Sequence, residues 1–240
     1  MIQEKKKSGF PTKRVITAII FIAITILAAV YGSWALTFYM VVLIVVGMKE
    51  LTELFVAKNL KAAMWVVYLS NFALITVAYM NKKEWLLPVF VIGCIVAFVQ
   101  YVFSKEKFSV NDMSSTFMAM IYTGLLPVHF LLLRNLPAPV GQEVSVSWLE
   151  PGAGYLILTV LTVVMVDTCA YFVGKNFGKH KLCEHISPNK TIEGSIGGAS
   201  GAIVTAVGLS FFTELTIFQT LGLSIIIVVF AQLGDLVESL

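Results

Sequence analysis

The chain has 240 residues, of which 58% are hydrophobic and only 13% are charged, and its formal net charge is +3 at pH 7. Soluble domains carry about 25% charged residues, because charged side chains cover the surface that faces water. The charged fraction of this chain is about half of that value, which excludes an ordinary soluble globular protein. Lipid must therefore be the solvent for most of the surface. We therefore expect a lipid bilayer, and no nucleic acid, among the partners of the chain.

Eight apolar stretches predict eight membrane-spanning helices. They lie at about residues 15–31, 34–48, 62–80, 85–103, 115–133, 154–174, 194–212 and 217–234. A helix needs about 20 mostly apolar residues to span a bilayer, and strands with open edges cannot span one. The expected fold class is all-α, a polytopic membrane protein with about eight transmembrane helices. The second stretch is short and also fits a tilted or re-entrant segment.

The distribution of positive charge predicts the orientation in the membrane. With an N-terminal tail, residues 1–14, in the cytoplasm, 14 of the 17 Lys and Arg residues fall in cytoplasmic segments. Positive charge favours the cytoplasmic side, so we expect a multi-pass protein of the cell inner (plasma) membrane whose tail and 175–193 loop are cytoplasmic. Transmembrane helices occupy 15–133, an external connector without a site follows at 134–153, and the site lies in 154–240.

Asp167 is a carboxylate inside the apolar stretch LTVVMVDTCAYFVG. A charged residue near the bilayer centre costs about 3 kcal/mol on insertion scales, so it usually faces a polar cavity or a partner. Asp167, Tyr171 and Gly174 are spaced i, i+4, i+7 and share one helix face. This face predicts a functional site, with a structural carboxylate paired to a Lys or to helix-terminal amides as the alternative.

Ser187, Lys190 and Glu193 belong to the most polar long stretch, FVGKNFGKHKLCEHISPNKTIEG. Pro188 cannot continue a helix, so a new helix begins after it. A helix start with free N–H groups beside a Lys and a Ser is suited to bind phosphate. A capped helix end with a snorkelling Lys explains the same local pattern equally well.

The stretch GSIGGASGA, residues 194–202, contains small residues at high density. Small residues let helices or a ligand approach the backbone closely, and helix packing is the commoner use in membranes. We therefore favour packing over ligand binding. The GK[ST] end of a phosphate-binding loop does not occur in this stretch.

Asp235 and Glu238 are spaced i, i+3 in AQLGDLVESL. Two carboxylates on one helix face near a membrane surface suit Mg²⁺, which prefers oxygen ligands and keeps waters and substrate phosphates. A solvated helix end is an equal alternative. The cysteines, at 94, 169 and 183, and the histidines, at 129, 180 and 185, lack metal-binding spacing, and no catalytic role is expected for them.

Three blocks in order, DTCAYFVGKNFGK, SPNKTIEGSIGG and QLGDLVESL, with the opening KRVITAIIF, resemble the bacterial phosphatidate cytidylyltransferases, also called CDP-diacylglycerol synthases. The resemblance covers the chain and implies an enzyme that joins phosphatidate to CTP, releases pyrophosphate and requires Mg²⁺. On this basis the predicted site residues are Asp167, Lys190 and Glu193 as catalytic, Tyr171, Ser187 and Lys190 as substrate-binding, and Asp235 and Glu238 as metal ligands.

The resemblance also implies a longer protein. Members of this family continue past the Ser-Leu at 239–240 into a signature with Lys-Arg, Lys-Asp and PGHGGxxDRxD, followed by another helix. We therefore expect a fragment whose metal site lacks acidic residues from that segment, so residues 1–240 alone should bind metal weakly and turn over little or no CTP.

Two other functions compete with this one. A transporter or channel would also use an intramembrane carboxylate, a glycine-interrupted helix and a cytoplasmic cluster of lysines. A CTP-dependent lipid kinase, transferring the γ-phosphate to a polyprenol or another lipid alcohol, would use the same phosphate cradle. A homodimer is a further candidate state.

Overall fold

The structure, a computed structural model, describes residues 12–104, 108–137 and 149–239. Most of the predicted N-terminal tail and most of the predicted 134–153 connector lie outside these ranges. The helices are α1 (Thr12–Tyr31), α2 (Ser33–Ala57), α3 (Met64–Tyr79), α4 (Leu86–Phe103), α5 (Val110–Met120), α6 (Leu126–Arg134), α7 (Pro151–Phe177), α8 (Ile192–Leu209) and α9 (Ile217–Glu238). Shorter turns are η1 (Lys83–Trp85), η2 (Ile121–Leu125) and η3 (Ser210–Phe212).

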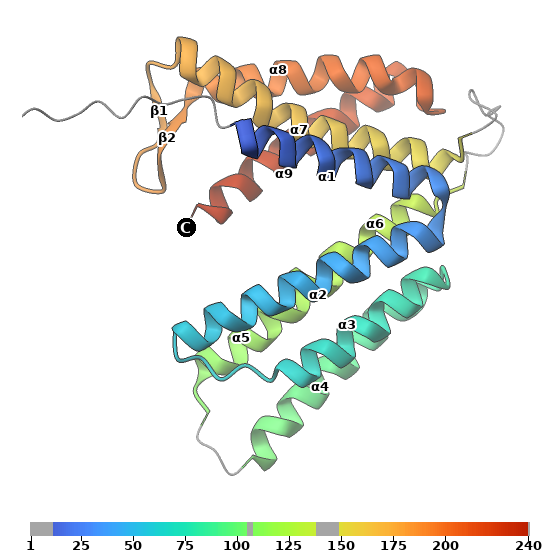
Figure 1. Cartoon of the computed structure of the whole chain (residues 1–240), viewed down its shortest axis with the longest axis vertical. Coiled ribbons are helices and arrows are strands. Elements are labelled where there is room, and N and C mark those ends of the chain that lie inside the picture. Colours follow the sequence, from blue (N-terminus) through green and yellow to red (C-terminus); the bar gives the residue numbers. More distant parts are fainter. Residues whose placement is uncertain (1–11, 105–107, 138–148, 240) are drawn as a thin grey trace, which may run out of the picture.

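Each of the eight predicted apolar stretches falls on a helical segment, and α5, η2 and α6 form one of these segments. The helices run back and forth between two ends of the molecule (Figure 1). Large apolar side chains lie exposed along them; Phe38, Val102, Phe103 and Phe218 are 70%, 75%, 80% and 87% exposed. Lipid is the solvent that such surfaces require, so the chain is an all-α, multi-pass membrane protein.

Within the described ranges, five helical segments are long and apolar enough to cross a membrane, and the predicted number of eight is not confirmed. The five are Lys83–Phe103, Val110–Arg134, Pro151–Phe177, Ile192–Phe212 and Ile217–Glu238. Two apolar helices are shorter, Ile16–Tyr31 and Met64–Tyr79. The predicted short second stretch is part of the 25-residue helix α2, whose last turns carry Lys49, Glu50 and Glu53.

The predicted 175–193 loop contains a β-hairpin, which is a correction to its description as a loop. Helix α7 continues to Phe177, and strands β1 (Lys181–Cys183) and β2 (Ser187–Thr191) then pair in antiparallel fashion. Residue Lys181 is opposite Thr191, and Cys183 is opposite Ser187. Pro188 lies within β2, where a two-stranded sheet offers an edge that tolerates a residue without an N–H.

Helices α7 and α8 pack closely because glycines face the partner backbone. A Cβ placed on Gly198 would lie 2.6 Å from the Val166 carbonyl oxygen, and one on Gly194 would lie 2.8 Å from the Ala170 carbonyl oxygen. These separations are shorter than any ordinary van der Waals contact of a Cβ. The packing role predicted for the 194–202 stretch is therefore confirmed.

Arg134, the first residue of the predicted external connector, is a buried residue at the end of α6. Its Nε donates to the Ala29 carbonyl oxygen of α1 at 2.5 Å, and its Nη1 pairs with Glu150 Oε2 at 2.6 Å. The hydrogen bond and charge of Arg134 lower the pKa of Glu150 from its ordinary value. These contacts fasten α1, the end of α6 and the start of α7 to one another.

Substituting Gly198 by alanine tests the close packing of α7 and α8. Gly198→Ala should lower the melting temperature in detergent, because overpacking a tight contact typically costs about 1–3 kcal/mol. Gly208→Ala, on the same helix, is the matched control, since a Cβ there meets nothing within 4 Å. Alanine stabilises a helix relative to glycine by about 1 kcal/mol, so the control Gly208→Ala should not lower the melting temperature. Equal or higher thermal stability of Gly198→Ala would contradict the packing.

Candidate functional site

A cavity of about 630 Å³ lies between α7, the hairpin, α8 and α9. Its walls come from Val166, Asp167, Ala170, Tyr171, Gly174 and Lys175 of α7, from Leu182 of β1, from Ser187, Asn189, Lys190 and Thr191 of β2, from Gly194 and Ser195 of α8, and from Gln232 and Asp235 of α9. Apolar side chains and polar groups of both charges share these walls. The cavity is therefore suited to a ligand that is both apolar and ionic.

Five of the seven predicted site residues line the cavity. They are Asp167, Tyr171, Ser187, Lys190 and Asp235. These residues come from three separate segments of the chain, and the fold brings them together. Glu193 and Glu238 are not part of the cavity wall.

Lys190 ties the hairpin to the last turns of α9. Its Nζ pairs with Asp235 Oδ2 at 2.8 Å and donates to the Asp235 carbonyl oxygen at 2.6 Å and to Ser239 Oγ at 3.1 Å. The Lys190 side chain is only 22% exposed. The ammonium group therefore lies among three oxygen atoms of the last turns of α9.

Asp167 lies ten residues before the end of α7, about 15 Å along the helix at 1.5 Å per residue. Its carboxylate is within electrostatic range of Asp235, Lys190 and Glu238. Among the described residues, no hydrogen bond or ion pair satisfies this carboxylate. The structure therefore does not supply the direct Lys or amide partner that a purely structural Asp167 would have.

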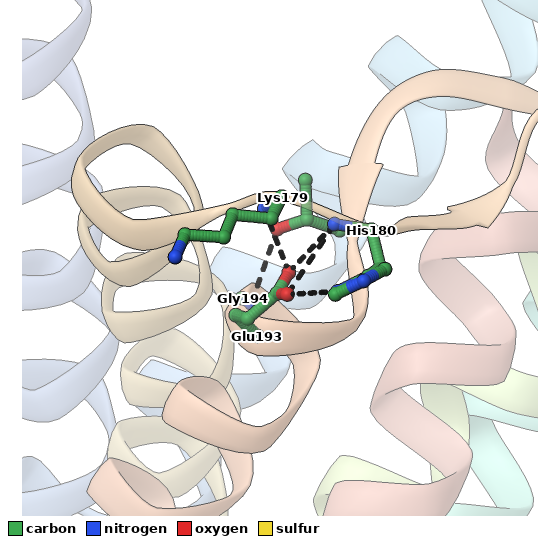
Figure 2. A network of polar contacts seen from close by, with 5 residues as sticks. Lys179, His180, Glu193 and Gly194 are labelled. Carbon is green, nitrogen blue, oxygen red and sulfur yellow. Dashed lines mark hydrogen bonds and ion pairs between the residues drawn. The ribbon is translucent and has the colours of Figure 1, made fainter.

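Glu193 binds the connection between α7 and β1 (Figure 2). Its Oε2 accepts the Lys179 backbone N–H at 3.0 Å, and its Oε1 lies 2.6 Å from His180 Nδ1. Thr191, the N-cap of α8, accepts the Gly194 N–H at 3.1 Å. The Glu193 carboxylate, in the first turn of α8, is thus bonded to Lys179 and His180. It does not point into the cavity as a free carboxylate.

The predicted metal ligands Asp235 and Glu238 lie one turn apart on α9, and Glu238 is exposed. Within the described part of the chain, no group of three or more His, Cys, Asp or Glu residues is arranged to hold a metal ion. The cysteines are free thiols, each half-buried. Asp235 and Asp167 are the carboxylates that face the cavity.

The sequence did not single out Ser195 and Gln232, which form a reciprocal pair in the cavity wall. Ser195 Oγ donates to Gln232 Oε1 at 2.6 Å, and Gln232 Nε2 donates to the Ser195 carbonyl oxygen at 3.0 Å. Gln232 precedes Asp235 by three residues and therefore shares its helix face. That spacing was the available signal for Gln232.

Comparison with known proteins matches residues 12–240 to a family described as the cytidylyltransferase family. The chain belongs to this family. It is 31% identical to the phosphatidate cytidylyltransferase of Staphylococcus haemolyticus over 236 residues, which cover 94% of this chain and 83% of that protein. The proteins of the same name from Staphylococcus epidermidis and Staphylococcus aureus are 31% and 29% identical, with the same coverage. No solved structure matches the chain.

Proposed function

We propose that the chain is a phosphatidate cytidylyltransferase, a membrane nucleotidyltransferase that converts phosphatidate and CTP to CDP-diacylglycerol and pyrophosphate. The observation that carries the proposal is the match to proteins of this name over 94% of the chain. The cavity supports it, because Lys190, two carboxylates and apolar side chains meet there at the end of membrane helices. A lipid phosphate and a nucleotide triphosphate need such a mixed environment.

The reaction is a substitution at phosphorus. An oxygen of the phosphatidate phosphate forms a bond to the α-phosphorus of CTP. The bond from that phosphorus to the oxygen bridging the α- and β-phosphates breaks, and pyrophosphate leaves with the bonding electron pair. Both reactants are anions, so the protein must align them and offset their charge.

The cavity residues divide this work in our proposal. Lys190 offsets triphosphate charge, as an ammonium group with mobile donors can do. The hydroxyl groups of Ser187 and Tyr171 donate to substrate oxygens. Asp167, ten residues before the end of α7, acts where the lipid phosphate meets the nucleotide. Glu193 belongs to the site through the contacts that hold the hairpin.

We propose Mg²⁺ as the cofactor. Asp235 and Asp167 face one cavity, and Glu238 is within electrostatic range of Asp167. Carboxylate oxygens are ligands that Mg²⁺ accepts, together with water and substrate phosphates. When bound there, the ion would neutralise phosphate charge and polarise a phosphoryl oxygen.

We further propose that all eight helical segments span the inner membrane, with the hairpin in the cytoplasm. The start of α1, the hairpin and the end of α9 lie at the same end of the molecule (Figure 1). This arrangement agrees with the cytoplasmic side that the charge distribution predicts and gives the cavity access to CTP. A homodimer stays a prediction.

Purified protein that includes the native sequence downstream of residue 240, supplied in detergent with CTP, Mg²⁺ and phosphatidate, should form CDP-diacylglycerol and pyrophosphate. Asp167→Asn keeps the size of the side chain and removes its charge, so it should lower turnover roughly a hundredfold or more with an unchanged melting temperature. Phosphorylation of a lipid alcohol with release of CDP would instead identify a lipid kinase. Normal turnover by Asp167→Asn would exclude Asp167 from the reaction.

Lys190→Ala should raise the KM for CTP roughly tenfold to a hundredfold, because a charge-assisted hydrogen bond contributes about 1.5–3 kcal/mol. The matched control is Lys179→Ala, which removes an exposed lysine outside the cavity wall and should leave the KM unchanged. Initial rates at varied CTP give both values. An unchanged KM for CTP in Lys190→Ala would contradict the proposed role of Lys190 in binding the triphosphate.

The orientation is tested with single cysteines in a background where the three native cysteines are replaced by serine. A membrane-impermeant thiol reagent should label His180→Cys from the cytoplasmic face of vesicles. Lys82→Cys, between α3 and η1, is the control and should be labelled from the opposite face. Labelling of position 180 from the outside alone would reverse the proposed orientation.

A further inference from the structure

We infer that Glu193 is a positioning residue: its carboxylate fastens the connection between α7 and β1 to the first turn of α8, and thereby holds the hairpin that carries Lys190 to the cavity. The kinetic part of this inference rests on the proposed function. The structural part does not depend on it.

The hydrogen bonds of the Glu193 carboxylate to other residues go to two consecutive residues of the connection (Figure 2). The Lys179 N–H donates to Oε2 at 3.0 Å, and the His180 N–H donates to Oε2 at 3.2 Å and to Oε1 at 3.3 Å. His180 Nδ1 lies 2.6 Å from Oε1. One side chain therefore receives two backbone N–H groups and one imidazole nitrogen.

The same stretch is also fixed by the backbone of β2 and α8. The Ile192 N–H donates to the His180 carbonyl oxygen at 2.9 Å. Before it, Gly178 lies so close to its neighbours that an added Cβ would approach the Gly174 carbonyl oxygen at 2.3 Å and Thr191 Cγ2 at 2.7 Å. The two strands of the hairpin are thus joined at their base, where Glu193 bonds to the segment that enters β1.

The bonds to backbone N–H groups carry most of this effect. A carboxylate acceptor makes each of them a charge-assisted hydrogen bond, which is stronger than a neutral one. The imidazole contact adds less, since the His180 side chain is 74% exposed and an exposed ion pair contributes little. A carboxylate in the first turn of α8 also interacts favourably with the helix dipole.

The hairpin depends on such anchors because an isolated two-stranded hairpin is marginally stable in water. Strand β2 presents Ser187, Asn189 and Lys190 to the cavity. A further anchor is the contact of Lys190 with Asp235 of α9. Without Glu193 the base of the hairpin would be held less firmly, and a displacement of about 1 Å at a reacting group can lower a rate roughly a hundredfold.

A glutamine at position 193 separates positioning from chemistry. Its amide oxygen accepts the same backbone N–H groups, and its nitrogen can donate to a neutral imidazole Nδ1. The negative charge is lost. A residue that positions by hydrogen bonding tolerates this change, whereas one that acts on substrate or metal through its charge does not.

The first measurement is amide hydrogen exchange on the full chain in detergent, without ligands. Glu193→Ala should accelerate exchange at Lys179 and His180 roughly tenfold or more, while Glu193→Gln should restore most of the protection. Glu184→Gln, an exposed carboxylate in the turn of the same hairpin, is the control and should exchange as the wild type does. Exchange at both amides within about twofold of the wild type in Glu193→Ala would overturn the inference.

The second measurement is the KM for CTP and kcat of the same variants. Glu193→Ala should raise the KM roughly tenfold or more, and Glu193→Gln should recover most of the loss. His180→Ala should change the KM less than about threefold. If Glu193→Gln is as defective as Glu193→Ala while its Lys179 and His180 amides keep wild-type protection, the charge acts directly and positioning is wrong.

The two measurements also separate this inference from the proposed function. Wild-type protein that forms no CDP-diacylglycerol would refute the function, and hydrogen exchange would still decide whether Glu193 holds the connection. If Glu193→Ala does not fold, Glu193→Gln and His180→Ala supply the comparison, because activity that follows amide protection across variants is the expected result. A variant that loses activity while its Lys179 and His180 amides keep full protection from exchange would contradict the inference.

Discussion

The close approach of α7 and α8 is the constraint on which the site depends. Gly197 and Gly201 face Val173 and Cys169 so tightly that an added Cβ would lie 2.5 Å and 2.3 Å from their side chains. Only helices that touch almost backbone to backbone can place the first turn of α8 beside the last turns of α7. The hairpin that links them must then fold back over this junction, because its two ends are already fixed side by side.

The cavity follows from this geometry. Helix α9 packs against α7 and α8 and closes the third side with Gln232 and Asp235. Polar groups gather at one end of helices whose outer faces are apolar, so the ionic part of the site meets the lipid part directly. This arrangement suits an enzyme that joins a water-soluble nucleotide to a lipid that remains in the membrane.

The helices could be predicted from the sequence because the length and apolarity of each stretch are local properties. The number of spans could not be settled in this way, since Ile16–Tyr31 and Met64–Tyr79 are shorter than an ordinary span. The hairpin was missed because KLC and SPNKT are short, mixed in polarity and stabilised by contacts from outside the strands. Spacing placed Asp167, Tyr171 and Gly174 on one face, but the contact of Lys190 with Asp235, 45 residues away, needs the fold. The role of Glu193 depends on two backbone N–H groups, which no side-chain motif encodes.

The contact of Lys190 with Asp235 has a consequence for how a ligand enters. These two side chains neutralise each other at 2.8 Å. A cation that bound Asp235 alone would leave the Lys190 ammonium group without a counter-ion. An anion that bound Lys190 alone would leave the Asp235 carboxylate without a counter-ion. A cation and an anion that bind together supply a counter-ion to Asp235 and to Lys190 at the same time. Neither side chain is then left with an uncompensated charge. We therefore expect the cavity to favour a cation and a phosphate that arrive already bound to each other.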